Sequence, residues 1–174
     1  KGFRLFKQID GENFEEVTAN TKLSNEILQK SFSGIWTFDA ESDGDLDLIL
    51  SDGTVLQNNS DGSFSALKIF ENVKNLSDFV WADLDEDGDS DVVILDSSLN
   101  KKIRLFLNER GGIFKEKEIP ALILVYGFDV GDLDGDGRLD LIFFKQGGNI
   151  FRASYNPDKN NFDSAEMYNF ANPI

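Results

Sequence analysis

The chain has 174 residues, 40% of them apolar, which is long enough to bury one core or a row of small repeated cores. Its 32 acidic residues outnumber 17 basic ones and give a formal charge of −15, which disfavours binding to nucleic acid and to anionic lipid. No stretch of about twenty apolar residues occurs, so no membrane insertion is expected. Cysteine and histidine are both absent, which excludes disulfides, thiolate nucleophiles, His-ligated zinc and the Ser-His-Asp triad.

Short strands joined by glycine-containing turns are expected along the chain, because it carries 15 glycines and 16 phenylalanines but only 3 prolines. The first element covers residues 1–19, where two strands flank a turn that ends at Phe14. Residues 20–33 are polar and are expected to form a connector.

Residues 34–71 predict a block of four strands. The first strand enters an acidic loop at residues 39–47, and the apolar strand from Leu48 to Leu50 leaves it. Asp52-Gly53 then predicts a hairpin turn, and the segment SDGSF, ending at Phe64, predicts the turn before the outer strand.

Two further blocks follow the same plan. They are residues 78–120 with an acidic loop at 83–91, and residues 125–168 with an acidic loop at 132–140. The strands after these loops, Val92 to Leu95 and Leu141 to Phe144, are continuous apolar runs. Because the runs do not alternate with polar residues, both faces of each strand are expected to be covered.

The blocks recur with a regular period. The first aspartates of the acidic loops, Asp39, Asp83 and Asp132, are about 44 and 49 residues apart, a spacing typical of four-stranded propeller blades. An inner blade strand is covered on both faces by neighbouring blades. We therefore predict an all-β fold, a β-propeller segment of about three four-stranded blades plus two strands of a preceding blade.

Each acidic loop follows the pattern D-x-[DE]-x-D-G-x-x-D, with carboxylates at positions 1, 3, 5 and 9 and glycine at position 6. Calcium takes six to eight oxygen ligands, so alternate residues of a tight loop can all contribute, and glycine permits the sharp turn. Position 7 is expected to contribute its backbone carbonyl. The pattern therefore predicts about three Ca²⁺ ions, one per loop.

The predicted ligands are the four carboxylates of each loop and the carbonyl of its seventh residue. They are Asp39, Glu41, Asp43, Asp47 and the carbonyl of Asp45; Asp83, Asp85, Asp87, Asp91 and the carbonyl of Asp89; and Asp132, Asp134, Asp136, Asp140 and the carbonyl of Arg138. The first loop is expected to bind most weakly, because Glu41 is one methylene longer than the aspartates at position 3 of the other loops.

The acidic loops have two other possible interpretations, an EF-hand and metal-free turns. An EF-hand requires a bidentate glutamate at position 12, where this chain has Leu50, Ile94 and Phe143 in strand-like runs. Asp-Gly clusters also form solvated turns without metal. Three loops in one repeat phase, each gathering four mutually repelling carboxylates, favour a bound cation over that alternative.

The segments ADLDEDGDSDVVIL and GDLDGDGRLDLIFF, together with the turn near Phe64, resemble the FG-GAP/VCBS repeats of integrin-alpha-type propellers. The first repeat departs from this pattern at Glu41 and around Phe38. The resemblance implies a ring of six to eight blades, calcium in the blade hairpins, and an extracellular, cell-surface or periplasmic location.

The function expected on this basis is a calcium-binding scaffold for structure, adhesion or recognition, with a protein or glycan as its ligand. No catalytic residues are predicted. The alternative is a part, catalytic or not, of a calcium-dependent polysaccharide lyase or hydrolase, whose chemistry could use paired carboxylates or a basic residue.

Three blades cannot close a propeller ring, so the remaining blades are expected from the same chain, another subunit or a second copy. The terminal blades should then expose apolar side chains where those blades join. We expect these side chains near Phe3, Leu5 and Phe6 at one end, and near Phe151, Tyr155 and Phe162 at the other.

Overall fold

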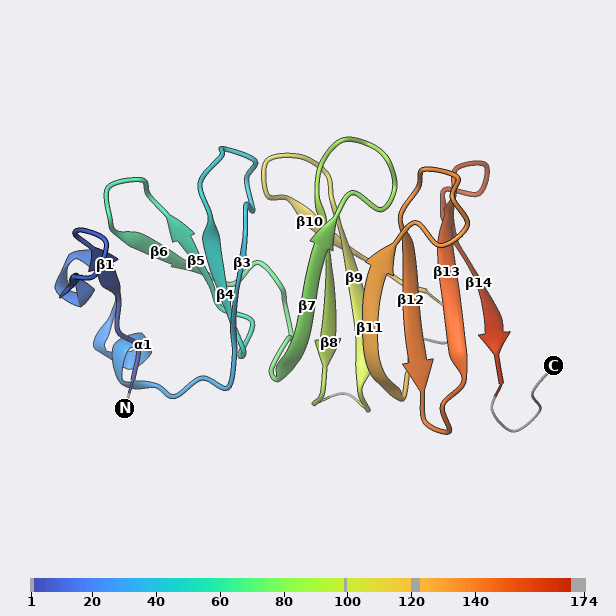
Figure 1. Cartoon of the computed structure of the whole chain (residues 1–174), viewed down its shortest axis with the longest axis horizontal. Coiled ribbons are helices and arrows are strands. Elements are labelled where there is room, and N and C mark those ends of the chain that lie inside the picture. Colours follow the sequence, from blue (N-terminus) through green and yellow to red (C-terminus); the bar gives the residue numbers. More distant parts are fainter. Residues whose placement is uncertain (1, 99, 120–122, 170–174) are drawn as a thin grey trace. The chain divides into compact units, whose positions relative to one another are not determined.

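The computed structural model describes residues 2–98, 100–119 and 123–169 (Figure 1). Nearly all of its regular elements are β-strands, which form three four-stranded sheets and one two-stranded sheet, all antiparallel. The predicted all-β class with blade-like sheets is therefore confirmed. The chain divides into two compact units, residues 1–72 and 73–174. Residues 1 and 120, at the ends of two expected segments, lie outside the described residues.

The first unit begins with a hairpin and two short helices, and it continues into one sheet. Its elements are β1 (Phe6–Gln8), β2 (Phe14–Glu16), the 3₁₀ helix η1 (Thr18–Thr21), α1 (Asn25–Gln29), β3 (Ile35–Phe38), β4 (Asp47–Leu50), β5 (Val55–Asn58) and β6 (Phe64–Leu67). Helix α1 was not among the predicted elements. Its N-cap is Ser24, whose side chain accepts a hydrogen bond from the Ile27 N–H at 3.4 Å.

The second unit contains two sheets. The strands of one are β7 (Leu76–Ala82), β8 (Asp91–Asp96), β9 (Lys102–Asn108) and β10 (Phe114–Lys117), and those of the other are β11 (Val125–Gly131), β12 (Asp140–Lys145), β13 (Ile150–Asn156) and β14 (Asn161–Tyr168). In every sheet the strands are hydrogen-bonded in their order along the chain. No described helix is long and apolar enough to cross a membrane.

Glycines form the tight turns between the second and third strands of two sheets. Gly53, with φ of 77°, turns the chain between β4 and β5. Gly147 and Gly148, with φ of 96° and 88°, do so between β12 and β13. These positive φ values are strained for other residues. Asp52-Gly53 was correctly expected to lie in a hairpin turn.

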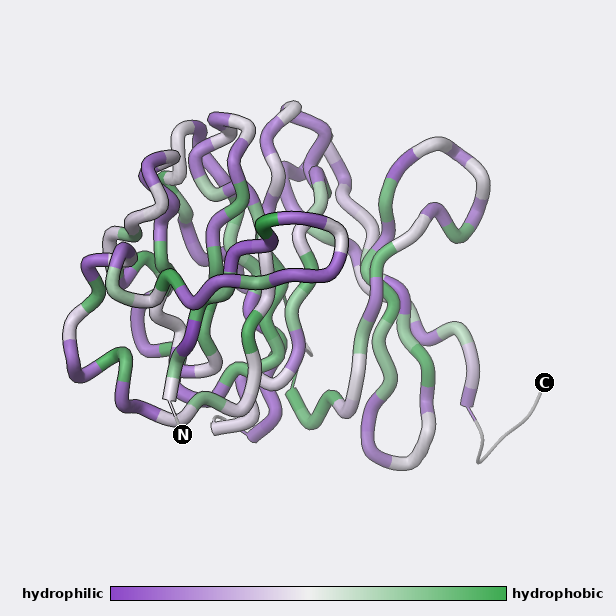
Figure 2. Tube along the Cα trace, turned by 60° about the vertical axis from the view of Figure 1, so that its left-hand side comes forward, coloured by the Kyte–Doolittle hydropathy of each residue, from purple (hydrophilic) through white to green (hydrophobic). Residues whose placement is uncertain are grey.

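The two sheets of the second unit enclose a common core. Its buried members are Leu84, Val93, Leu95, Ile103, Leu105, Ile119, Val125, Leu141, Phe143, Ala153 and Phe162. In Figure 2 the green, apolar stretches of the trace alternate with purple stretches, which gather at many of the loops. The core therefore lies between the two sheets, and many of the loops are hydrophilic.

One expectation about apolar surface proves wrong in the second unit. Phe162 is only 4% exposed, and Phe151 and Tyr155 pack against the same core, so these three residues do not face an open side. The opposite face of the last sheet is open instead. Phe144, which pairs with Ile150 across the strands, is 46% exposed, so β12 is not covered on both faces. Alternation along the strand places the two sets of residues on opposite faces.

Candidate metal centre

Each acidic loop connects the first and second strands of its sheet. The loops at 39–47, 83–91 and 132–140 join β3 to β4, β7 to β8 and β11 to β12. In the second unit, the two loops lie at the same end of their sheets (Figure 1). There the Arg138 guanidinium of the third loop pairs with the Glu86 carboxylate of the second at 3.2 Å.

The three loops share one hydrogen-bond pattern although their sequences differ. The aspartate at position 1 accepts a hydrogen bond from the N–H of position 6. The aspartate at position 5 accepts one from the N–H of position 7, and the aspartate at position 9 accepts one from the N–H of position 2. All nine distances lie between 2.8 and 3.1 Å. The acceptors are Asp39, Asp43 and Asp47; Asp83, Asp87 and Asp91; and Asp132, Asp136 and Asp140.

Backbone conformation explains the glycine at position 6. Gly44, Gly88 and Gly137 have φ of 92°, 94° and 90°, a region that other residues rarely adopt. Position 4 is also left-handed in all three loops, although only the third has a glycine there. Together these positions curl the backbone so that side chains at positions 1, 3 and 5 can point inward.

The second loop gathers three carboxylates that pair with no basic side chain among the described residues, although Arg110 and Arg138 pair with Asp89 and Glu86 of the same loop. Asp83, Asp85 and Asp87 each place a carboxylate oxygen within 4.8 Å of the others. Oδ1 of Asp83 and Oδ1 of Asp85 are buried and have no hydrogen-bond partner. Burial, and then the charge of Asp87, raises the pKa of Asp85. A buried acceptor without a partner costs free energy, so this group is suited to a cation.

The third loop gathers the corresponding residues, Asp132, Asp134 and Asp136, within the same 4.8 Å. Here a cation of the protein is already present, because Arg152 of β13 donates hydrogen bonds to Asp134 and Asp140. The hydrogen bond from Arg152 lowers the pKa of Asp134. Arg152 was missed in the sequence, because only the strand register reveals that it reaches the loop.

The first loop is arranged differently. Within the described part of the chain, only the second and third loops bring three carboxylates so close together. Glu41 instead accepts a hydrogen bond from the Gln57 side chain on β5. Oδ1 of Asp45, at position 7, is buried without a partner, although only the carbonyl of that residue was expected to contribute. The weak binding expected of this loop stays a prediction.

The aspartate at position 9 connects each loop to its sheet through hydrogen bonds. Asp47, Asp91 and Asp140 are 1%, 0% and 2% exposed. In Asp91, Oδ2 accepts the N–H of Leu84 and Oδ1 that of Asn108 on β9, both at 2.9 Å. A carboxylate oxygen has two lone pairs, so these bonds are compatible with metal coordination. Sequence spacing predicted only that the aspartate at position 9 is a metal ligand. It did not reveal that this aspartate also accepts hydrogen bonds from the loop and from a neighbouring strand.

Burial also raises the pKa of Asp91 to about 7. In calcium-free protein we therefore expect the stability of residues 73–174 to fall as the pH rises from about 5.5 to 8. Between these two pKa values the folded state keeps the proton of Asp91, whereas the unfolded state, with a pKa near 3.8, has released it. The stabilisation from this proton is therefore full below pH 3.8 and is lost as the pH rises through about 7. Thermal unfolding of calcium-stripped protein across this range measures the effect.

The control for this pH prediction is Asp91→Asn, which cannot ionise and should show a flatter profile between these pH values. Asp47, whose pKa burial raises to about 6, belongs to the other unit and should be followed separately. A melting temperature of the 73–174 unit that stays constant or rises over this range in wild-type protein would contradict the prediction.

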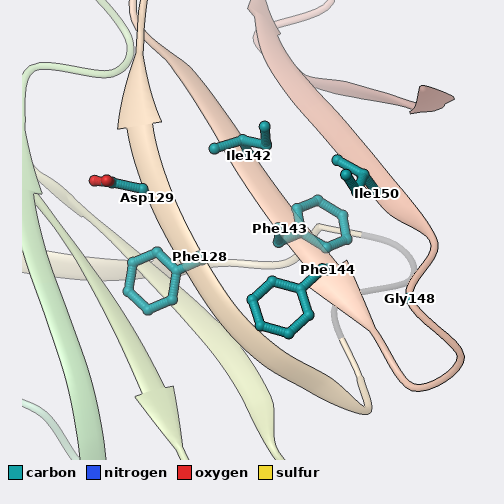
Figure 3. A pocket seen from close by; sticks show the side chains of 7 residues that line it. All are labelled: Phe128, Asp129, Ile142, Phe143, Phe144, Gly148 and Ile150. Atoms are coloured by element: carbon teal, nitrogen blue, oxygen red, sulfur yellow. The ribbon is translucent and has the colours of Figure 1, made fainter. Parts of the chain in front are cut away.

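A hollow of about 380 Å³ opens elsewhere on the last sheet, near the turn from β12 to β13. It is lined by Phe128, Asp129, Ile142, Phe143, Phe144, Gly148 and Ile150 (Figure 3). The only charged side chain in this lining is Asp129. The hollow is therefore suited to packing against an apolar surface and offers no pair of acid and base.

The donors of the acidic loops fit a hard divalent cation. Carboxylates and backbone carbonyls are the ligands that Ca²⁺ prefers, whereas structural zinc sites use thiolate and imidazole. Three carboxylates from positions 1, 3 and 5 already converge in two loops. The backbone carbonyl of position 7 and the carboxylate of position 9 could complete the shell.

Comparison with protein families agrees with this geometry. A family model described as an FG-GAP-like repeat matches residues 83–143. The matched segment begins at the first aspartate of the second loop and ends in the strand that follows the third, so it contains both loops that gather carboxylates. The resemblance inferred from these two segments is confirmed. No curated protein matches the chain.

Proposed function

We propose that this FG-GAP-like repeat segment is a calcium-stabilised part of a β-propeller that serves as a recognition scaffold and not as an enzyme. The observation that carries the calcium assignment is the pair of buried, unpartnered oxygens on Asp83 and Asp85, beside the third carboxylate of Asp87. A divalent cation at this point would satisfy both oxygens and offset the repulsion among the three charges.

The proposed role of the ion is structural. Each loop joins the first two strands of a sheet, and its position 9 also holds a neighbouring strand in the first two sheets, through Asn58 and Asn108. An ion bound to positions 1, 3, 5 and 7 would therefore fix the end of the sheet. Weak calcium sites of extracellular modules work at about 0.1–1 mM Ca²⁺, so we place the protein outside the cell, at the cell surface or in the periplasm.

Two kinds of partner follow from this proposal. The open face at Ile142, Phe144 and Ile150 is suited to another propeller blade, from the same chain, another subunit or a second copy. The ligand of the complete scaffold would be a protein or a glycan. A screen of both classes, with calcium and then with chelator, would identify it and would also reveal polysaccharide cleavage if the alternative enzyme function holds.

We expect Asp87→Ala to abolish calcium binding at the second loop, whereas Asp89→Ala should leave the affinity within about threefold. Both variants remove one carboxylate from the same loop, but only Asp87 belongs to the converging group, while the side chain of Asp89 pairs with Arg110 at 3.4 Å. Calorimetric titration with Ca²⁺ should show one site fewer in the first variant only.

The same samples give a second readout. At free calcium 100-fold above the dissociation constant, each occupied site stabilises its unit by about 2.7 kcal/mol, so chelation should lower the melting temperature. Equal loss of affinity in Asp87→Ala and Asp89→Ala would show that the assignment of loop positions is wrong. Wild-type protein that binds no calcium at millimolar concentration would refute the proposed function.

A further inference from the structure

Arg152 lies against the third acidic loop. Its Nε donates to Oδ1 of Asp140 at 2.8 Å and to Oγ of Ser154 at 2.7 Å, and its Nη2 donates to Oδ2 of Asp134. The Ser154 hydroxyl in turn donates to Oδ1 of Asp140 at 2.5 Å. The arginine side chain is 25% exposed and Asp140 only 2%. One guanidinium thus joins positions 3 and 9 of the loop.

In the other two sheets, the described residue at the equivalent place is apolar. Strand register pairs Leu141 with Ala153 in the last sheet and Val92 with Phe106 in the sheet before it. The residues that precede these partners, Arg152 and Leu105, are therefore equivalent. In the first unit Leu48 pairs with Leu56, so the equivalent residue is Val55. Leu105 and Val55 are both fully buried and apolar.

The surroundings of position 3 differ accordingly. In the second loop Asp85 has a buried oxygen without a hydrogen-bond partner. In the third loop Asp134 accepts a hydrogen bond from the guanidinium of Arg152. The three converging carboxylates of the second loop thus have no cationic partner among the described residues, whereas in the third loop the Arg152 side chain compensates part of the corresponding charge.

We infer that Arg152 is a built-in counter-cation, which holds the third loop in its folded conformation without calcium and lowers its calcium affinity below that of the second loop. This inference rests on the proposed function for its calcium part. A calcium ion at the third loop must share or displace the two carboxylates that Arg152 binds, and it is repelled by the guanidinium charge. At the second loop, no described basic side chain binds the three converging carboxylates in this way.

The two loops can be followed separately, because Gly88 and Gly137 each donate their N–H to the first aspartate of their own loop. Amide NMR signals of these glycines should report a dissociation constant for each loop during a Ca²⁺ titration. In wild-type protein we expect the third loop to bind about tenfold more weakly than the second. Arg152→Gln should tighten binding at Gly137 about tenfold, equivalent to about 1.4 kcal/mol, and leave Gly88 unchanged.

Lys159→Gln is the matched control, since it removes a positive charge from the same unit, where Lys159 pairs with Asp163 outside the loops. It should shift the Gly137 constant by less than about twofold. Arg152→Leu, which installs the residue found in β9, should reproduce Arg152→Gln. If the Gly137 constant moves no further in the Arg152 variants than in Lys159→Gln, the inference fails.

A second measurement does not depend on calcium binding. In calcium-free protein the amides of Gly137 and Arg138, which donate to Asp132 and Asp136, should exchange with solvent about tenfold faster in Arg152→Gln than in wild type. Unchanged exchange overturns the inference. If neither glycine responds to millimolar calcium, the proposed function fails, and the exchange rates still decide whether Arg152 holds the loop.

Discussion

Asp91→Ala is expected to lower the free energy of unfolding of residues 73–174 by about 2–6 kcal/mol, even in the absence of calcium. The carboxylate is fully buried and accepts the N–H groups of Leu84 and Asn108, residues that are each 2% exposed. Alanine would leave both donors without a partner, at about 1–3 kcal/mol each. Denaturant unfolding of calcium-stripped protein measures the loss.

Two variants define the cause of this effect. Asp91→Asn keeps one acceptor oxygen and should lose about half as much stability. Asp89→Ala removes a carboxylate of the same loop that forms an ion pair with the exposed Arg110, and it should cost less than about 1 kcal/mol. If calcium-free Asp91→Ala were as stable as Asp89→Ala, position 9 would have no role beyond binding the metal.

Phe143→Ala is expected to destabilise the same unit by about 3–5 kcal/mol, because it opens a cavity in the core between the two sheets. The side chain is 1% exposed and its ring stacks on Phe151 with centroids 5.4 Å apart. Calorimetric or denaturant unfolding, followed by the transition of residues 73–174, would measure the change.

The next residue in the chain provides the comparison. Phe144 lies on the opposite face of β12 and is 46% exposed, so Phe144→Ala should cost less than about 1 kcal/mol in this chain. Equal losses for the two variants would show that the sheets do not pack through the Phe143 face. If another blade covers Phe144 in a larger assembly, its substitution should become costly there.

The acidic loops and the sheets around them could be predicted from the sequence because both depend on local patterns. Loop positions 1, 3, 5 and 6 follow from residue type and backbone conformation within nine residues. The continuous apolar run from Val92 to Leu95 indicated a buried strand, and all six residues of β8 are buried. Helix α1 was missed because its five residues are too few for a periodic pattern to stand out.

Features that depend on which strands are neighbours could not be predicted. Arg152 stands 18 residues from Asp134, and only the register of β12 against β13 brings it to the loop. The face on which Phe151 and Tyr155 lie was predicted wrongly for the same reason, since shifting a strand by one residue exchanges its two faces. The burial of Asp91 likewise depends on Asn108 of β9.

The order of strands within each sheet bears on how the chain folds as it is made. Every sheet pairs only strands that are consecutive in the chain, so each can assemble from local hairpins, the kind of contact that forms fast. The β7–β10 sheet is complete before β11 to β14 exist, and its face with Val93, Leu95 and Leu105 then has no partner. At about 5–20 residues per second, synthesis of residues 125–168 takes on the order of 2–9 s, and during this interval the nascent chain exposes this apolar face to aggregation and to chaperones.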